Sequence, residues 1–78
     1  METFYGVVVD YHPRGFFFIL PDGSRKQIFG HTRDVVGRLT LRAGDRVAFR
    51  TDPSPKGPRA VEVRLLSETD VSVAGRLQ

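Results

Sequence analysis

The 78-residue sequence predicts an all-β fold, and three features of the chain support this. Short runs rich in β-branched and aromatic residues recur, several of them alternating between apolar and polar positions as half-buried strands do. Eight glycines and five prolines, many for this length, mark frequent turns between those runs. No stretch carries the long apolar stripe of an amphipathic helix. We therefore expect one small β domain in residues 1–66, followed by a polar tail in residues 67–78.

The first strand is expected over residues 3–11, where β-branched and aromatic residues dominate. Alternation places Phe4, Gly6 and Val8 on one side of this strand. Gly6 inside the run indicates a bend or a close backbone approach, as a small barrel needs. Residues 12–15 then form a tight connection to the next strand.

Residues 14–31 predict a β-hairpin, because two runs of β-favouring residues flank a Pro-Asp-Gly-Ser turn signal at residues 21–24. Folding about this turn fixes the pairing, since the residue numbers of cross-strand partners have a constant sum. The predicted pairs are Asp22–Arg25, Ile19–Ile28, Phe18–Phe29, Phe17–Gly30 and Phe16–His31. Side chains alternate across a strand, so one face of the sheet gathers four rings. They belong to Phe16, Phe18, Phe29 and His31, with Arg14 at the border.

A long connection with weak patterning follows in residues 32–44. Residues 32–36 suit a single helical turn that Gly37 ends. Leu39 and Leu41 are expected to anchor the rest of this loop on the core, and residues 43–45 form a turn.

Two more strands complete the domain. Residues 46–50 alternate, with Val47 and Phe49 inward. The side chains predicted to face outward are those of Arg46, Ala48 and Arg50. Prolines mark residues 52–58 as a loop, because they lack the amide donor that a strand interior needs. Residues 59–66 alternate again. The inward side chains predicted for this last strand are Val61, Val63 and Leu65.

Five strands, with a three-strand meander first and a long excursion before the fourth, match a five-stranded Greek-key barrel of the OB type. An SH3-like barrel is the nearest competitor on strand count. Two possibilities stay open for residues 67–78, namely a disordered tail or an extra edge strand at residues 71–74.

The grouping of the rings on one face indicates that they form a binding surface and are not part of the core. Phe17, Phe49 and Phe4 suit a core, but a small barrel has one interior, so the neighbours of Phe17 point outward if Phe17 points inward. The reverse assignment would place the titratable ring of His31 in a small core. Rings on a solvent-facing sheet offer stacking platforms to unpaired bases, and basic side chains beside them follow the phosphate backbone.

The charge of the chain is compatible with a polyanionic partner. The formal net charge is +3, and residues 1–66 hold eleven Lys and Arg against seven Asp and Glu, hence +4. Ten of the twelve basic residues are arginine, which suits bidentate phosphate contacts and stacking on bases. A merely solvated surface can carry the same charge, so composition alone does not decide the partner.

Other classes of protein are not indicated. Without cysteine the chain has neither disulfides nor thiolate metal sites, and His12 and His31 lack metal-site spacing. No nucleophile elbow or phosphate-binding glycine motif occurs. We therefore expect no enzyme, no catalytic residue, no metal, no cofactor and no small-molecule substrate. The chain shows no signal peptide and no membrane-spanning run, so a cytoplasmic protein without membrane contact is expected.

Four motifs in order resemble the bacterial cold shock domain family between Gly6 and Leu66. The segment Arg14-Gly15-Phe16-Phe17-Phe18-Ile19 is similar to the family's first RNA-binding motif, Lys-Gly-Phe-Gly-Phe-Ile. The segment Ile28-Phe29-Gly30-His31 is similar to the second, Val-Phe-Val-His. The second half matches in Leu41-x-x-Gly44-x-x-Val47-x-Phe49 and Lys56-Gly57-Pro58-x-Ala60-x-x-Val63. The resemblance implies an OB barrel that binds single-stranded RNA and DNA with little sequence preference. By matching position it implies stacking by Phe16, Phe18, Phe29 and His31, with Tyr11, Arg14 and Lys56 beside them.

The chain also departs from this family. The family's Lys-Trp-Phe-Asn stands here as Val9-Asp10-Tyr11-His12, so a carboxylate replaces a stacking tryptophan. Thr32 and Arg38 stand where the family has further aromatic rings, and the loop around Arg38 is shorter. We expect weaker binding of thymine- or uracil-rich strands than is usual for the family, and a stronger salt dependence. The residues expected to replace stacking partly by charge are Arg14, Arg33 and Arg38.

The inner side of the hairpin departs as well. Phe17 stands where the family has glycine, and Gly30 stands where it has valine. Because these two residues are predicted cross-strand neighbours, the ring added on one strand is offset by the side chain removed from the other. Core volume is then roughly kept.

Two functions follow as alternatives. The first is a single-stranded RNA- or DNA-binding module, acting as an RNA chaperone or expression regulator, and expected as a monomer or weak dimer. The second is an OB-fold module for protein interaction or self-association with weak nucleic-acid binding, because Asp10 and Thr32 alter the face. The sequence leaves open RNA against DNA preference, the cellular target and any induction by cold.

Overall fold

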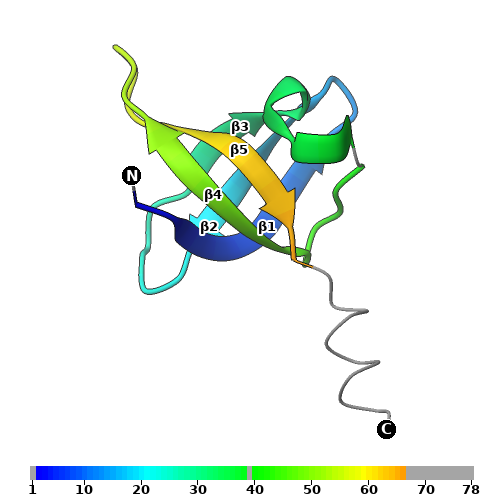
Figure 1. Ribbon diagram of the computed structural model, residues 1–78, viewed down its shortest axis with the longest axis horizontal. Coiled ribbons are helices and arrows are strands. Elements are labelled where there is room, and N and C mark those ends of the chain that lie inside the picture. The colour runs from blue at the N-terminus through cyan, green and yellow to red at the C-terminus, as the bar shows by residue number, and fades with distance from the viewer. Residues whose placement is uncertain (1, 39, 67–78) are drawn as a thin grey trace, which may run out of the picture.

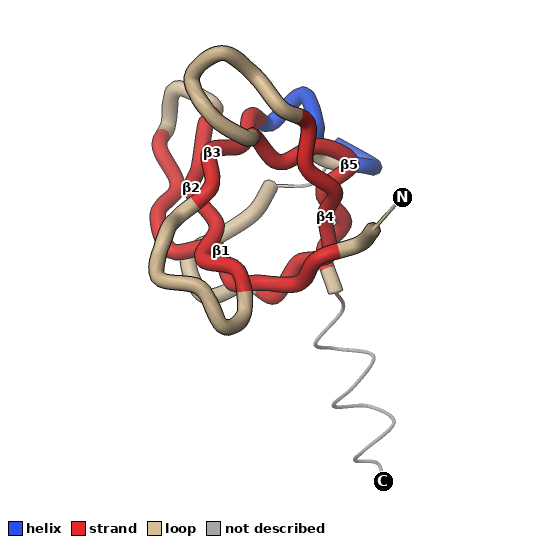
Figure 2. Tube along the Cα trace, turned by 90° about the vertical axis from the view of Figure 1, so that its left-hand side faces the viewer, coloured by secondary structure: helices blue, strands red, loops and turns tan. Residues whose placement is uncertain are grey.

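The computed structural model describes residues 2–38 and 40–66, which form a closed barrel of five strands (Figure 1). The strands are β1 (Phe4–His12), β2 (Phe16–Pro21), β3 (Ile28–His31), β4 (Arg46–Asp52) and β5 (Arg59–Leu65), with the 3-10 turns η1 (Thr32–Asp34) and η2 (Val36–Arg38) after β3. Their order around the barrel is β1-β2-β3-β5-β4, and β4 closes on β1, as the ring of strands in Figure 2 shows. Strands β3 and β5 run parallel and the other neighbours antiparallel. The predicted five-stranded Greek-key OB barrel is confirmed.

The register between β2 and β3 is the predicted one. Phe16 pairs with His31, Phe17 with Gly30, Phe18 with Phe29 and Ile19 with Ile28. The fifth predicted pair, Asp22 with Arg25, lies outside this ladder, because β3 begins only at Ile28. The turn of residues 21–24 is closed by a hydrogen bond from the Ser24 amide to the Pro21 carbonyl, 3.0 Å long.

Apolar side chains from β1, β2, β4, β5 and the β3–β4 connection fill the barrel, and the partly buried Ile28 of β3 packs against them. In the described part of the chain the buried core comprises Val8, Phe17, Ile19, Val35, Leu41, Val47, Phe49, Ala60 and Val63. Phe17 is fully buried, and its ring occupies the space in front of Gly30. A carbon added at Gly30 would lie 2.5 Å from Cε1 of Phe17, closer than carbon atoms approach without a bond. The predicted volume compensation between the two residues therefore has a direct geometric basis.

A β-bulge in β1 reverses the alternation of that strand. Val8 pairs with Ile19, but Asp10 pairs with Phe18, so Val9 has no counterpart on β2. Gly6 and Val8 face the interior before the bulge, whereas Tyr11 takes the inner position after it. Asp10 and the last residue of β1, His12, are thereby turned to the outer face.

A second bulge changes the inward residues of β5. Phe49 of β4 stands opposite both Glu62 and Val63, and Glu62 adopts a φ of 48°. As a result Ala60 and Val63 are buried, while Val61, predicted to face inward, is only half-buried. The prediction for Val61 is wrong because strict alternation does not hold across the extra residue.

Two further expectations are wrong. Phe4 is 36% exposed rather than a core residue, although its ring contacts Phe49 with centroids 6.0 Å apart. Ala48 was expected to face outward, yet it is buried. Leu41 anchors the β3–β4 loop as predicted, whereas Leu39 and the tail of residues 67–78 lie outside the described residues.

No helix among the described residues is long and apolar enough to cross a membrane.

Asp22 ties the β2–β3 turn to the start of β4. Its carboxylate accepts hydrogen bonds from Nη1 and Nη2 of Arg46 at 2.7 and 2.9 Å. These hydrogen bonds lower the pKa of Asp22; partial desolvation opposes the shift and the Arg46 charge adds to it.

The Phe17–Gly30 contact predicts that Gly30→Ala affects the stability of the barrel differently in two backgrounds. Gly30→Ala should destabilise the wild-type barrel by about 1–3 kcal/mol, because the added carbon overlaps the Phe17 ring. In a Phe17→Leu background the same substitution should be neutral or stabilising by up to about 1 kcal/mol, since the ring is gone and alanine restricts the unfolded chain. Urea unfolding measures both. If Gly30→Ala lowers the free energy of unfolding equally in the two backgrounds, the Phe17 ring does not limit the space at Gly30.

The Asp22–Arg46 contact predicts a pH-dependent effect. Since folding lowers the pKa of Asp22, the stabilisation is present above the ordinary aspartate range and disappears as the pH falls below about 4. Asp22→Asn should therefore lower the melting temperature at pH 7 and have no effect at pH 2. Glu2→Gln, at an exposed carboxylate, is the control. If Asp22→Asn lowers the melting temperature as much at pH 2 as at pH 7, the stabilisation by the Asp22–Arg46 contact is not ionic.

Candidate functional site

Aromatic rings form a continuous patch on the outer side of β1, β2 and β3. Phe16 stacks on His12, with ring centroids 4.3 Å apart and planes inclined by 19°. Phe29 lies 5.9 Å from Phe16 at 28°, and Phe18 meets both phenylalanines edge to face at 5.9–6.1 Å. Phe29 is 40% exposed, and Phe16 and Phe18 are half-buried. These rings and the neighbouring His31 are called the aromatic face below.

The alternation of β2 and β3 explains three members of this face. Phe16 and Phe18 flank the buried Phe17, and Phe29 precedes the buried Gly30, so all three side chains point away from the interior. The predicted grouping of these three rings is confirmed by the contacts between them. Phenylalanine outside a core exposes apolar area to water, and such a patch is typical of a binding surface.

His12 belongs to the same face, although the sequence did not indicate it. The bulge at Val9 turns it outward, and it pairs with Phe16 in the β1–β2 ladder. Its Nε2 lies 3.2 Å from Oδ2 of Asp10. The only sequence signal for this position is the short connection at residues 13–15, which allows β1 and β2 to pair as far as His12 and Phe16.

Tyr11 lies on the opposite side of the sheet from this face. Its ring stacks on the buried Phe17, with centroids 6.0 Å apart and planes within 3° of parallel, and it packs against the core. Tyr11 is half-buried. Its ring therefore packs against the core and does not join the patch formed by Phe16, Phe18 and Phe29.

His31 ends β3 and begins the turn η1. Its Nδ1 accepts a hydrogen bond from the backbone amide of Arg33 at 3.1 Å, which caps this turn. The neutral imidazole therefore carries its proton on Nε2. The bond fixes the orientation of the imidazole, and His31 pairs with Phe16 in the β2–β3 ladder.

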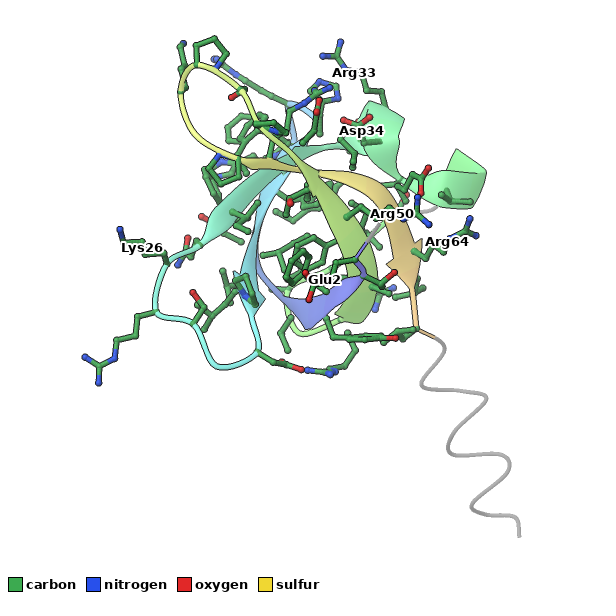
Figure 3. All side chains as sticks on the ribbon, turned by 60° about the vertical axis from the view of Figure 1, so that its left-hand side comes forward. Glu2, Lys26, Arg33, Asp34, Arg50 and Arg64 are labelled. Carbon is green, nitrogen blue, oxygen red and sulfur yellow. The ribbon has the colours of Figure 1, made fainter. Side chains whose placement is uncertain are left out.

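Basic side chains border the aromatic face on two sides. Arg14 is exposed in the β1–β2 connection, next to the motif residues. Arg33 is exposed in η1 and points away from the barrel in Figure 3. Lys56 is exposed at the tip of the β4–β5 loop. Arg38 is part of η2, but its side chain lies outside what the structure describes.

A pocket of about 410 Å³ adjoins the face at Phe29. The β4–β5 loop forms its other wall, with Ser54, Lys56, Gly57, Pro58 and Arg59 as lining residues. The Ser54 hydroxyl donates to the Gly57 carbonyl, and the Gly57 amide donates to the Ser54 carbonyl at 2.9 Å, so the loop is internally braced. This volume lies within the range of small-molecule sites.

Arg59 lines this pocket, but its guanidinium is held in ion pairs with two carboxylates. Its Nη1 lies 3.5 Å from Oδ2 of Asp34, and its Nε lies 3.7 Å from Oδ2 of Asp52. Oδ2 of Asp34 is buried without a hydrogen bond, so the Arg59 charge compensates this carboxylate. Lys56 supplies the exposed positive charge at the pocket.

Asp10 and Thr32 stand at two of the positions where the sequence departs from the family that it resembles. Asp10 is exposed and pairs with Phe18, so its carboxylate stands among the rings. Thr32 is half-buried, and its amide donates to the Gly15 carbonyl at 2.9 Å. Residues 2–38 and 40–66 contain no group of three or more His, Asp or Glu side chains that could hold a metal ion.

Comparison with known proteins gives consistent matches. The model of the "cold-shock" DNA-binding domain family matches residues 4–66. Cold shock-like protein CspA of Bordetella pertussis is 36% identical over 69 residues, which is 85% of this chain and 100% of that protein. Cold shock-like protein CspD of Escherichia coli is 40% identical over 63 residues, which is 78% of this chain and 84% of that protein.

A solved structure of Drosophila, Unr CSD456, shares the fold. It matches 86% of this chain with a TM-score of 0.74 at 18% sequence identity. The chain spans 28% of the length of that structure.

Proposed function

The chain belongs to the cold-shock DNA-binding domain family, and we propose that it binds single-stranded RNA or DNA through the aromatic face. The observation that carries the proposal is the contact between the rings of Phe16, Phe18 and Phe29 on an outer sheet surface. A continuous ring surface offers successive platforms to unpaired bases, whereas a duplex keeps its bases stacked on one another and unavailable.

Stacking on this face needs no sequence readout, because every base has a flat π surface. Phe29, the most exposed of the three phenylalanines, stands between the face and the pocket of the β4–β5 loop. We assign this pocket to one base, with Lys56 beside the adjoining phosphate. His31 offers both a ring surface and an Nε2 donor at the other end of the face.

Phosphate contacts are assigned to the bordering cations. Arg14, Arg33 and Lys56 are exposed around the face, and Arg38 follows in η2. Arginine and lysine near a strand of phosphates release counterions on binding, and this release adds affinity without sequence preference. Tyr11 supports the face from inside by stacking on Phe17.

This binding mode suits an RNA chaperone or an expression regulator. Trapping unpaired bases disfavours hairpins in the nucleic acid, and no bond is made or broken. The proposed mechanism therefore needs no catalytic residue, cofactor or small-molecule substrate, and a monomer or weak dimer suffices for it.

One observation favours a second candidate function. Asp10 places a carboxylate on the aromatic face, where it repels phosphate. A face of rings with a carboxylate is also suited to a polypeptide partner or to a second copy of the chain. Under this alternative, binding of an oligonucleotide is absent from the start.

Removing single rings from the face should weaken binding without unfolding the protein. Phe18→Ala and Phe29→Ala are each expected to reduce affinity for oligo-dT about 5- to 150-fold, the equivalent of about 1–3 kcal/mol per stacked base. Fluorescence anisotropy of a labelled oligonucleotide measures the affinity, and circular dichroism checks the fold. Tyr5→Ala is the matched control, because Tyr5 is 48% exposed but lies in the part of β1 that pairs with β4. Equal losses for Tyr5→Ala and Phe29→Ala would rule out the assigned face.

The bordering cations should make binding strongly salt-dependent. Three to four phosphate contacts predict a slope of log affinity against log salt of about −2 to −3, so affinity falls about 16- to 64-fold between 50 and 200 mM salt. Arg33→Gln should reduce the magnitude of the slope by about 0.7. Arg64→Gln, an exposed arginine on β5, is the control and should leave the slope unchanged. Tight binding with a slope near zero would contradict the assignment of phosphate contacts to these cations.

A further inference from the structure

The outer end of β1 carries a contact that the stacking mechanism leaves unused. His12 Nε2 lies 3.2 Å from Asp10 Oδ2, and the imidazole of His12 covers Phe16 with centroids 4.3 Å apart. Both polar side chains are accessible to water, with exposed fractions of 39% for His12 and 58% for Asp10. A titratable pair therefore stands directly among the rings that are proposed to stack on bases.

The charge of this pair depends on one proton. With His12 neutral, the pair carries one negative charge, that of Asp10. With His12 protonated, the imidazolium offsets that charge and the pair is neutral. An imidazole is the side chain that ordinarily gains its proton as the pH falls from about 7 to about 6.

Charged, aromatic and titratable groups surround His12 on each element that packs against it. On β1 the facing charge is Asp10, which attracts an imidazolium. On β2 the facing residues are Phe16, whose ring face attracts a cation, and Phe18, whose ring is nearly perpendicular to the imidazole. The β1–β2 connection contributes the exposed Arg14, and β3 contributes His31 on the far side of Phe16.

We propose that the Asp10–His12 pair makes binding of single strands proton-dependent, with affinity rising as the pH falls. The proposal rests on the function proposed above, because it concerns the same face. Neutral His12 leaves the Asp10 carboxylate to repel the incoming phosphates. Protonated His12 removes this repulsion and still stacks on Phe16, so one added proton strengthens the binding of one nucleic-acid chain.

The charge change sets the expected size of the effect. A unit charge about 4 Å from a phosphate in water corresponds to a change in affinity of about fivefold. Oligo-dT is the probe, because thymine has no group that titrates between pH 7.5 and 5.8. Wild-type protein at constant ionic strength should therefore bind oligo-dT about fivefold more tightly at pH 5.8 than at pH 7.5.

Three variants test whether His12 is the residue whose protonation strengthens binding. His12→Phe keeps a ring on Phe16 but cannot be protonated, and His12→Asn places there the residue that the family carries; both should lose the gain at low pH. His31→Gln should bind more weakly at both pH values and keep the gain, since its imidazole is not the one paired with Asp10. Circular dichroism at both pH values confirms that each variant is folded.

The outcomes separate this proposal from the proposed function. A gain in the wild type that disappears in both His12 variants and persists in His31→Gln supports the proposal. Binding of equal strength at the two pH values, or a gain that survives in both His12 variants, overturns the proposal and leaves the proposed function standing. No binding of oligo-dT at either pH overturns both.

Discussion

The packing of Phe17 inside the barrel is the constraint from which the aromatic face follows. A barrel of five strands has one small interior, and Phe17 occupies part of it because Gly30 on the neighbouring strand leaves the room. Strand alternation then forces Phe16 and Phe18 outward, and the β2–β3 register brings Phe29 and His31 to the same side. One buried contact thus fixes both the core and the surface that is proposed to bind bases.

Hairpin geometry made this part of the fold predictable. The turn at residues 21–24 and the constant sum of paired residue numbers determine every pair in the β2–β3 ladder. The two bulges were not predictable, because an extra residue such as Val9 or Glu62 leaves no mark in composition and shifts all later side chains by one position. This shift explains why His12 joins the aromatic face, why Tyr11 turns inward and why Val61 is only half-buried. Phe4 was misplaced for another reason, since it lies at the first position of β1, where the barrel no longer encloses it.

The proposed interface combines two weak attractions rather than one strong one. The ring surface offers stacking platforms, while Arg14, Arg33 and Lys56 offer charge at its border. Asp10 opposes phosphate beside these rings, and His12 is placed to cancel its charge when protonated. A family member with this composition is expected to hold single strands loosely and to release them readily as salt or pH changes, which suits a chaperone that must let its partner refold.

The central claim is that single strands bind on the outer side of β1, β2 and β3, and amide chemical shifts measured during titration test it most directly. Adding oligo-dT to ¹⁵N-labelled protein should shift the amides of the non-proline residues in 10–18, 28–33 and 54–59, which cover the aromatic face, its cations and the pocket. The amides of residues 4–7 and 46–49, on the β1–β4 side, should stay in place. Shifts centred on residues 4–7 and 46–49, or no shifts at millimolar oligo-dT, would contradict the account.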